Sequence, residues 1–375
     1  MTNAILPPAT IGIVGGGQLG RMLALAAKTM GYRVVILDST PDSPAGQVSD
    51  EQIIAEYNDT KALLQLAEVA DVLTYEFENV DLQTLNEAGK IAALPQGTEL
   101  LRLTKNRLRE KTFLQAQGLP VANFAEVTGP DDLLAAVEKV GTPAILKTVE
   151  GGYDGHGQWD IPDVQTAEKL LTDATLPINL TLILEKKISF DRELSVMVTR
   201  DGNDEVRVWP TVENIHDNHI LKTTFAPATV SVVLDEKIHE IASTIANQIN
   251  LRGVLGIEMF VQGDQVYINE LAPRPHNSGH YSIEGTNLSQ FEGHIRSICG
   301  LPIPEIELRE QTLMLNLLGT ELTSARNDLI HQPNWHFHDY GKAEIKTARK
   351  MGHITALGAK NIQALQAWGT EHGES

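Results

Sequence analysis

The chain has 375 residues, 42% of them hydrophobic and 21% charged, which is typical of a globular protein of two or three domains. The formal net charge of −19 argues against a general nucleic-acid binder, which would need a basic face. The single cysteine, Cys299, excludes a disulfide framework and a cysteine metal cluster, and we expect it to be a buried helix residue. No leader and no apolar run of about 20 residues is evident, so we expect a cytoplasmic, non-membrane protein.

The first predicted elements form a strand–helix–strand unit. Residues 10–14 are predicted as a buried strand, residues 21–30 as a helix and residues 33–37 as a second strand followed by Asp38. Between the first strand and the helix lies Gly15-Gly16-Gly17-Gln18-Leu19-Gly20, a G-x-G-x-x-G turn typical of dinucleotide-binding units. Because backbone N–H groups at a helix start can hold any phosphate, the turn alone leaves the ligand open.

Two carboxylates follow the next predicted strand. Residues 72–75 are strand-like and lead into Glu76-Phe77-Glu78. Ligands of open α/β sheets bind at the carboxyl ends of strands, where these residues stand. They could equally be solvated loop charges.

The middle of the chain begins with a predicted basic helix at 103–117, which carries Arg107 among four positive charges. These charges either bind an anion or are simply solvated. A helix at 130–140 and a strand at 144–148 carrying Lys147 come next. The glycine-rich loop at 151–158 can approach phosphates closely but lacks the P-loop pattern.

Further strands are predicted at 180–185, 193–198 and 208–215, followed by a helix at 235–250. The lone His216 after the third of these strands is more often structural than a ligand in such a position. A later helix is expected at 288–298.

A predicted hairpin carries the densest group of functional side chains. Residues 256–261 and 266–268 form its strands around a Gly263-Asp264 turn, which brings Glu258 and Glu270 near each other. Two close carboxylates repel unless a cation lies between them, and oxygen ligands of this kind suit Mg²⁺. Asn269, Arg274, His276 and Asn277 follow within a few residues.

The tail, residues 311–375, is expected to form a small separate unit with strands at 312–318 and 336–340 and a short helix near 323–329. Residues 341–350 hold Lys342, Lys346, Arg349 and Lys350. In so acidic a chain this basic island is a candidate anion site, or alternatively a solvated hairpin.

The whole chain resembles the ATP-grasp superfamily, and within it the 5-(carboxyamino)imidazole ribonucleotide synthetase family. The motifs occur in the family's order: Gly16 to Met22, Glu76-Phe77-Glu78, Gly151 to Gly155, Asn269 to His280, and Arg349 to His353. The resemblance implies a mixed α/β fold of three domains: a Rossmann-like preATP-grasp domain at 1–102, an ATP-grasp domain at 103–310 and a small carboxy-terminal domain at 311–375. It also implies carboxylation of 5-aminoimidazole ribonucleotide with ATP, Mg²⁺ and bicarbonate through carboxyphosphate, and a homodimer.

The resemblance further implies roles for individual residues. Arg107 and Lys147 would contact ATP phosphates, under a loop of Gly152, Tyr153, Asp154, Gly155, His156, Gly157 and Gln158. The adenine and ribose would lie against Glu185, Lys186, Lys187, Ile188, Glu193 and His216. Glu258 and Glu270 would hold two Mg²⁺ with help from Asn269. The aminoimidazole ribonucleotide and the bicarbonate-derived group would be surrounded by Gln18, Leu19, Glu76, Tyr153, Asp154, Arg274, His276 and Asn277, with Lys342 and Arg349 on the 5′-phosphate.

Two positions depart from the family pattern: His156 stands where Arg or Lys is common, and Lys346 stands where Arg is common. The reaction needs phosphate neutralisation and exclusion of water, but no nucleophilic Cys or Ser. It also needs a base for the amine's proton, and Asp154 and His276 are the two candidates that the sequence leaves open.

Three alternatives remain at this point. An NAD-dependent dehydrogenase would account for the amino-terminal turn, but not for the 269–280 cluster or the 151–158 loop. A non-catalytic ATP-binding protein would be expected to lack Glu258 or Glu270, and both are present. A formate-using or biotin-using ATP-grasp relative is disfavoured by the Arg349 to His353 motif and the short tail.

Overall fold

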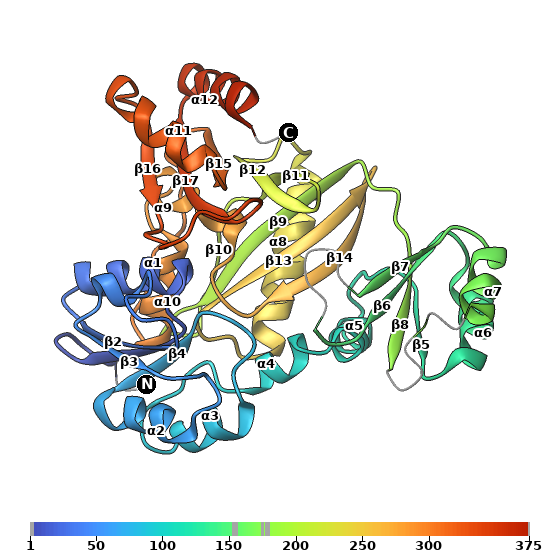
Figure 1. Ribbon diagram of the computed structural model, residues 1–375, viewed down its shortest axis with the longest axis horizontal. Helices are drawn as coiled ribbons and strands as arrows, with labels where there is room; N and C mark the ends of the chain where they lie inside the picture. Colours follow the sequence, from blue (N-terminus) through green and yellow to red (C-terminus); the bar gives the residue numbers. More distant parts are fainter. Residues whose placement is uncertain (1–3, 152–156, 174–175, 177–180, 374–375) are drawn as a thin grey trace. The chain divides into compact units, whose positions relative to one another are not determined.

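The computed structural model describes residues 4–151, 157–173, 176 and 181–373 (Figure 1). These residues divide into two compact units, which we describe separately. Unit 1 comprises residues 1–100, 194–257 and 272–375, and unit 2 comprises residues 101–193 and 258–271. Among the described helices, none is long and apolar enough to cross a membrane.

Unit 1 begins with the predicted strand–helix–strand unit. A four-stranded parallel sheet has the order β3-β2-β1-β4, formed by β1 (Thr10–Val14), β2 (Arg33–Asp38), β3 (Glu51–Ile54) and β4 (Val72–Tyr75). Strands β1, β2 and β4 are mostly buried and apolar, whereas the edge strand β3 is partly exposed. The helices between these strands and after them are α1 (Gln18–Thr29), α2 (Thr60–Val69) and α3 (Leu82–Ala88). Side chains of α1 share a core with α10 (Gln290–Ile298), and Cys299 at the end of α10 is buried there as predicted.

A second sheet in unit 1 contains the strand order β9-β11-β12-β15-β17-β16, with β10 beside β9. Its strands are β9 (Arg192–Arg200), β10 (Val206–Val208), β11 (Val212–Asp217), β12 (Ile220–Ala226), β15 (Thr312–Leu318), β16 (His336–Asp339) and β17 (Lys350–Leu357). The same parts of unit 1 also contain four helices: α8 (Val232–Gln248), α9 (Ser282–Gly285), α11 (Glu321–Asp328) and α12 (Ala359–His372). The predicted strand at 208–215 was wrong as a single element, because Pro210 separates β10 from β11.

Unit 2 contains a smaller sheet of order β5-β8-β6-β7, made of β5 (Phe124–Val127), β6 (Ala144–Thr148), β7 (Gln158–Ile161) and β8 (Leu182–Lys186). Helices α6 (Pro130–Val140) and α7 (Val164–Thr172) lie beside this sheet (Figure 1). Their apolar side chains share a core with those of its strands. The hairpin of β13 (Val254–Gln262) and β14 (Gln265–Ala272) is present as predicted.

The predicted basic helix at 103–117 is two helices, α4 (Glu99–Thr104) and α5 (Arg107–Ala116). Asn106 causes the break, because its side chain accepts a hydrogen bond from Arg109 N and so caps the start of α5. Arg107 thereby becomes the first residue of a helix rather than one of a continuous basic face.

Candidate active site

Unit 1 has a pocket of about 260 Å³ lined by residues from separate stretches of the chain: Gln18, Leu19, Glu76, Phe77, Arg274, His276, Asn277 and Lys350. Six of the eight were predicted to surround the aminoimidazole ribonucleotide. Phe77 and Lys350 were not assigned, although both lie in motifs that carried the resemblance. The tertiary structure therefore brings six predicted substrate residues together around one pocket, whereas Lys342 and Arg349 of the same unit are not among its lining residues.

The amino-terminal glycine turn holds carboxylates of the chain itself. Gly17 N donates to Glu76 Oε1 at 2.5 Å and Gly20 N donates to Glu76 Oε2 at 2.6 Å. Gly16 N donates to Asp38 Oδ2 at 2.7 Å. The glycines are needed for this close approach, since a Cβ on Gly17 would lie 2.6 Å from Glu76 Oε1.

These contacts change the interpretation of the turn. Three N–H groups that the sequence suggested for a phosphate are used by Glu76 and Asp38, and Asp38 also accepts from Tyr57 Oη at 2.5 Å. Burial raises the pKa of Glu76, whereas the hydrogen bonds from Gly20 N and Gly17 N act in the opposite direction and lower it. The turn therefore positions Glu76 at the pocket instead of offering these N–H groups to a ligand.

Arg274 and Asn277 are also held by specific partners. Arg274 Nη2 lies 3.3 Å from Glu78 Oε1. Asn277 exchanges side-chain hydrogen bonds with Asn316 of β15, and Asn316 Nδ2 also donates to Leu221 O at 2.9 Å. The backbone carbonyl of Leu221 fixes the orientation of the Asn316 amide, which in turn orients Asn277.

The basic island of the tail, where the 5′-phosphate was predicted to bind, contains two residues with a left-handed backbone conformation. Gly341 and Ala348 adopt φ of +70° and +62°. Lys342 Nζ donates to Lys350 O at 2.6 Å, while Arg349 is exposed. Burial, with a smaller contribution from Arg349, lowers the pKa of Lys342 to about 8. Lys342 is therefore a cation at neutral pH that can lose its charge under mildly alkaline conditions.

Unit 2 brings together the residues predicted for ATP phosphates. Arg107, at the start of α5, donates from Nε and Nη2 to the two carboxylate oxygens of Glu185 on β8. Lys147 Nζ on β6 lies 3.1 Å from Glu185 Oε2. Burial alone would raise the pKa of Glu185, but Arg107, Lys147 and Lys111 hold it well below its ordinary range. Two cations are thus fixed around one buried carboxylate.

The same arginine connects this group to the hairpin. Arg107 Nη2 donates to Asn269 Oδ1 at 3.0 Å, and Arg107 Nη1 lies 3.7 Å from Glu270 Oε2. Glu258 stands on the neighbouring strand β13. In the described part of the chain, no group of three or more His, Cys, Asp and Glu side chains is arranged to hold a metal. Glu258, Glu270 and Asn269 nevertheless offer only hard oxygen ligands, which fits a Mg²⁺ that completes its shell with phosphate and water.

Two residues of α5 to which the sequence assigned no role contact the backbone of β14, the strand that carries the metal-ligand candidates Asn269 and Glu270. Lys111 of α5 is buried, and its Nζ donates to Ile268 O and Asn269 O, both at 2.7 Å. Glu110 accepts from Leu271 N at 3.3 Å. Burial lowers the pKa of Lys111 and raises that of Glu110. The position of Asn269 and Glu270 thus depends on α5.

Other predicted nucleotide residues have simple local positions. Lys186 N donates to Asn123 O and Lys187 N donates to Pro143 O, so the segment from Glu185 to Ile188 is fixed through its backbone. Gln158 starts β7 opposite Lys147, and Gly157 O accepts from Thr148 N. Glu193 belongs to β9 and His216 to a bulge in β11. The predicted residues Gly152, Tyr153, Asp154, Gly155 and His156 lie outside the described residues.

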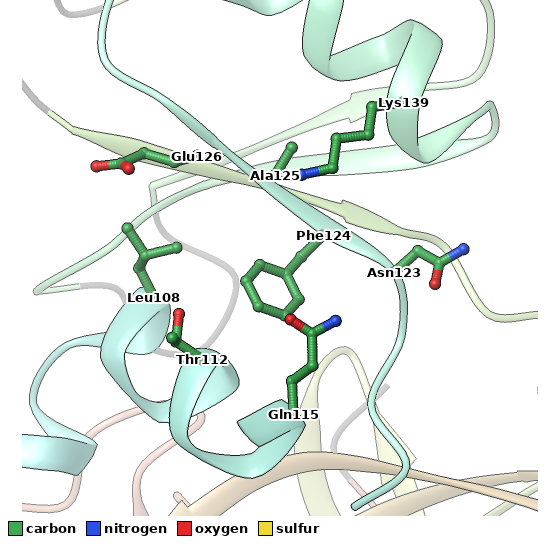
Figure 2. A pocket seen from close by; sticks show the side chains of 8 residues that line it. All are labelled: Leu108, Thr112, Gln115, Asn123, Phe124, Ala125, Glu126 and Lys139. Carbon is green, nitrogen blue, oxygen red and sulfur yellow. The ribbon is translucent and has the colours of Figure 1, made fainter. Parts of the chain in front are cut away.

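A second pocket, in unit 2, has a volume of about 410 Å³ and is lined by none of the predicted residues (Figure 2). It is lined by α5, β5, α6 and the segment before β5, through Leu108, Thr112, Gln115, Asn123, Phe124, Ala125, Glu126 and Lys139. Lys139 is the one basic residue among these eight described lining residues, which therefore lack the paired cations that a triphosphate needs.

Comparison with known proteins gives a consistent family assignment. Three family models match in order: the ribonucleotide synthetase preATP-grasp domain at residues 8–102, the ATP-grasp domain at 112–291, and the phosphoribosylaminoimidazole carboxylase C-terminal domain at 312–367. The N5-carboxyaminoimidazole ribonucleotide synthase of Bacillus subtilis is 47% identical over 94% of this chain and 92% of its own length.

Solved structures agree with these matches. An ADP complex of N5-carboxyaminoimidazole ribonucleotide synthetase is 44% identical, with a TM-score of 0.92 over 99% of this chain and 98% of its own. The Aspergillus clavatus enzyme in complex with ADP and 5-aminoimidazole ribonucleotide is 34% identical, with a TM-score of 0.87 over 99% of this chain and 98% of its own. These matches confirm the predicted fold class and set aside the dehydrogenase alternative.

Proposed function

Since the chain belongs to the N5-carboxyaminoimidazole ribonucleotide synthase family of ATP-grasp ligases, we propose how its own residues carry the ATP-dependent carboxylation of aminoimidazole ribonucleotide in purine biosynthesis. The observation that carries the proposal is the 260 Å³ pocket of unit 1, in which six residues predicted for this substrate meet. We also propose the domain division 1–102, 103–310 and 311–375, which the order of the three matched models supports.

The chemistry requires bicarbonate to be activated. Bicarbonate is a poor electrophile, and phosphorylation by ATP gives carboxyphosphate, which breaks down to CO₂ and phosphate beside the amine. Phosphoryl transfer depends mainly on positioning and charge neutralisation. Arg107 and Lys147 supply two fixed cations for the ATP phosphates, and Glu185 holds both in place before nucleotide binds.

A divalent metal is part of this proposal. Glu258 and Glu270 would hold Mg²⁺ with Asn269, and Lys111 keeps the backbone of that strand in position. When bound, the metal neutralises phosphate charge and orients the phosphate for in-line transfer. Gly152 to Gln158 are proposed to cover the phosphates, with Glu185, Lys186, Lys187, Ile188, Glu193 and His216 serving adenine and ribose.

For the second substrate, we assign Gln18, Leu19, Glu76, Tyr153, Asp154, Arg274, His276 and Asn277 to the aminoimidazole ribonucleotide and the group derived from bicarbonate. Lys342 and Arg349 are assigned to the 5′-phosphate. The short distance of Lys342 Nζ from the backbone of Lys350, a residue that lines the pocket, supports this assignment. Family membership also supports a cytoplasmic homodimer, and light scattering of the purified protein tests the dimeric state.

The experiment that tests the function measures ADP release by the purified protein with ATP and Mg²⁺. We expect fast release only when bicarbonate and aminoimidazole ribonucleotide are both present. Release that is unchanged when either is omitted would contradict the proposed reaction. Omission of Mg²⁺ with excess chelator should abolish release.

A further inference from the structure

His276 follows β14 and lines the pocket of unit 1, and its backbone is fixed on both sides. His276 N donates to Gln290 Oε1 at 2.9 Å, and Gln290 Nε2 donates to His276 O at 2.8 Å. Its Cβ lies against Gly256, where an added Cβ would come within 2.7 Å of it. The backbone that carries the imidazole ring is therefore held in a defined position.

One ring nitrogen of His276 lies against the backbone and the side chain of Ser278. Its Nδ1 lies 2.8 Å from Ser278 Oγ and 3.4 Å from Ser278 N. A backbone N–H can only donate, so Nδ1 accepts at this position. A neutral imidazole whose Nδ1 accepts carries its hydrogen on Nε2.

A buried chain of polar side chains supports the same hydrogen position. Ser278 Oγ lies 2.7 Å from Ser195 Oγ, which accepts from Asn214 Nδ2 at 2.8 Å, and Thr224 Oγ1 donates to Asn214 Oδ1 at 2.9 Å. These four side chains are 5% exposed or less. Each hydroxyl has a single hydrogen, and with Asn214 donating to Ser195, Ser195 can donate to Ser278 and Ser278 to His276, which is the direction that an accepting Nδ1 requires.

These hydrogen-bonded side chains come from separate parts of the sequence, and the pairing of the strands brings them together. Ser195 lies on β9, and Asn214 and Thr224 are direct cross-strand partners on β11 and β12. We propose that Ser278, Ser195, Asn214 and Thr224 are positioning residues that hold His276 as the Nε2–H tautomer, so that His276 acts as a hydrogen-bond donor in the carboxylation and not as the base. This inference rests on the proposed function of the pocket.

The chemistry gives the donor a defined task. When the amine nitrogen bonds to the carbon of CO₂, one C–O π bond breaks and its electrons become a negative charge on oxygen. A neutral imidazole N–H can stabilise that oxygen. Burial lowers the pKa of His276 well below its ordinary value, with Arg274 adding to the effect, so the ring is neutral at pH 7. Of the two candidates for the amine's proton, this leaves Asp154, which lies outside the described residues.

Substitution of His276 separates the two roles. Glutamine can present an amide N–H near the Nε2 position but cannot act as a base, whereas alanine can do neither. We expect His276→Ala to lower kcat by roughly 100-fold or more, the effect of losing one preorganised donor, and His276→Gln to recover at least about tenfold of that loss. Equal activity of the two variants overturns the donor role.

Ser195→Ala tests whether the buried series of hydrogen bonds positions His276. We expect kcat to fall about 3- to 10-fold, the effect of one buried hydrogen bond, with the KM for aminoimidazole ribonucleotide nearly unchanged. The matched control is Ser297→Ala, since Ser297 is equally buried but bonds Arg200 O and Gly253 N outside the chain. Its kcat should equal that of the wild type, and equal losses in both variants overturn the proposal.

Nitrogen NMR of ¹⁵N-histidine-labelled enzyme gives a readout that does not depend on turnover. In the wild type, the His276 signals should report an unprotonated Nδ1 and a protonated Nε2, and Ser195→Ala should add the other tautomer. A wild-type Nδ1 that carries the proton overturns the inference even if the variants fold poorly. If wild-type ADP release does not depend on aminoimidazole ribonucleotide, the proposed function fails instead.

Discussion

Replacement of Glu76 by glutamine should lower the free energy of unfolding by about 1–3 kcal/mol, the cost of one buried donor without an acceptor. The two carboxylate oxygens of Glu76 each accept a backbone N–H, from Gly17 at 2.5 Å and from Gly20 at 2.6 Å. Glutamine has the same size, but one of its terminal groups is an NH₂ that can only donate. Since Glu76 is 8% exposed, water cannot readily replace the lost acceptor.

The assay is urea denaturation followed by circular dichroism, with comparison of midpoints at constant slope. Glu78→Gln is the matched control, because Glu78 ends the same motif and its side chain is 31% exposed in a pair with Arg274. Such a partly exposed pair contributes about 0–1 kcal/mol, so the control should lose less stability.

A loss for Glu76→Gln no greater than that for Glu78→Gln would refute this reasoning. The glycine N–H groups would then not depend on the carboxylate, and a ligand phosphate could again be considered for the turn. Measurable NAD or NADP binding in the micromolar range would point the same way.

Three further predictions follow from the two sites. Glu270→Gln should lower turnover by at least ~100-fold at ordinary Mg²⁺ concentrations, because ATP phosphate charge is less compensated; near-normal turnover would contradict the metal assignment. Arg349→Ala should raise the KM for aminoimidazole ribonucleotide by roughly 10- to 150-fold through loss of a charge-assisted contact, while the KM for ATP barely changes; an equal rise for ATP would mean that a different ligand binds the tail. Because the pKa of Lys342 is lowered to about 8, its charge is present below that pH and lost above it, so kcat/KM for the ribonucleotide should fall as pH rises through about 8. Lys342→Arg stays charged and should keep its kcat/KM there; an identical alkaline fall in this variant would assign the titration to another group.

Several elements were predictable because their signals are local. The strands at 10–14, 72–75, 144–148 and 312–318 were predicted with the observed bounds, as was the helix at 130–140. Each is a run of apolar residues or an amphipathic repeat bounded by glycine, proline or polar residues. The strand at 350–357 and the helix at 359–372 were not predicted, although the strand is almost fully buried between β15 and β16.

The sequence by itself determined the chemistry of this protein, because ligand type depends on which functional groups are present and in what order. The carboxylates of the hairpin, the amide and imidazoles after it, and the basic tail are all visible as residues. Local spacing also predicted the hairpin itself.

Only the tertiary structure decided which polar groups are already used. The glycine turn is occupied by Glu76, which lies 59 residues from Gly17, and His276 is oriented through Ser278 by Ser195, 83 residues before that serine. Ser195 and Asn214 look like ordinary strand residues, and nothing in their local sequence suggests a link to a distant histidine. Such contacts are set by which strands pair and in which register, and that pairing depends on burial of the whole sheet rather than on neighbouring residues.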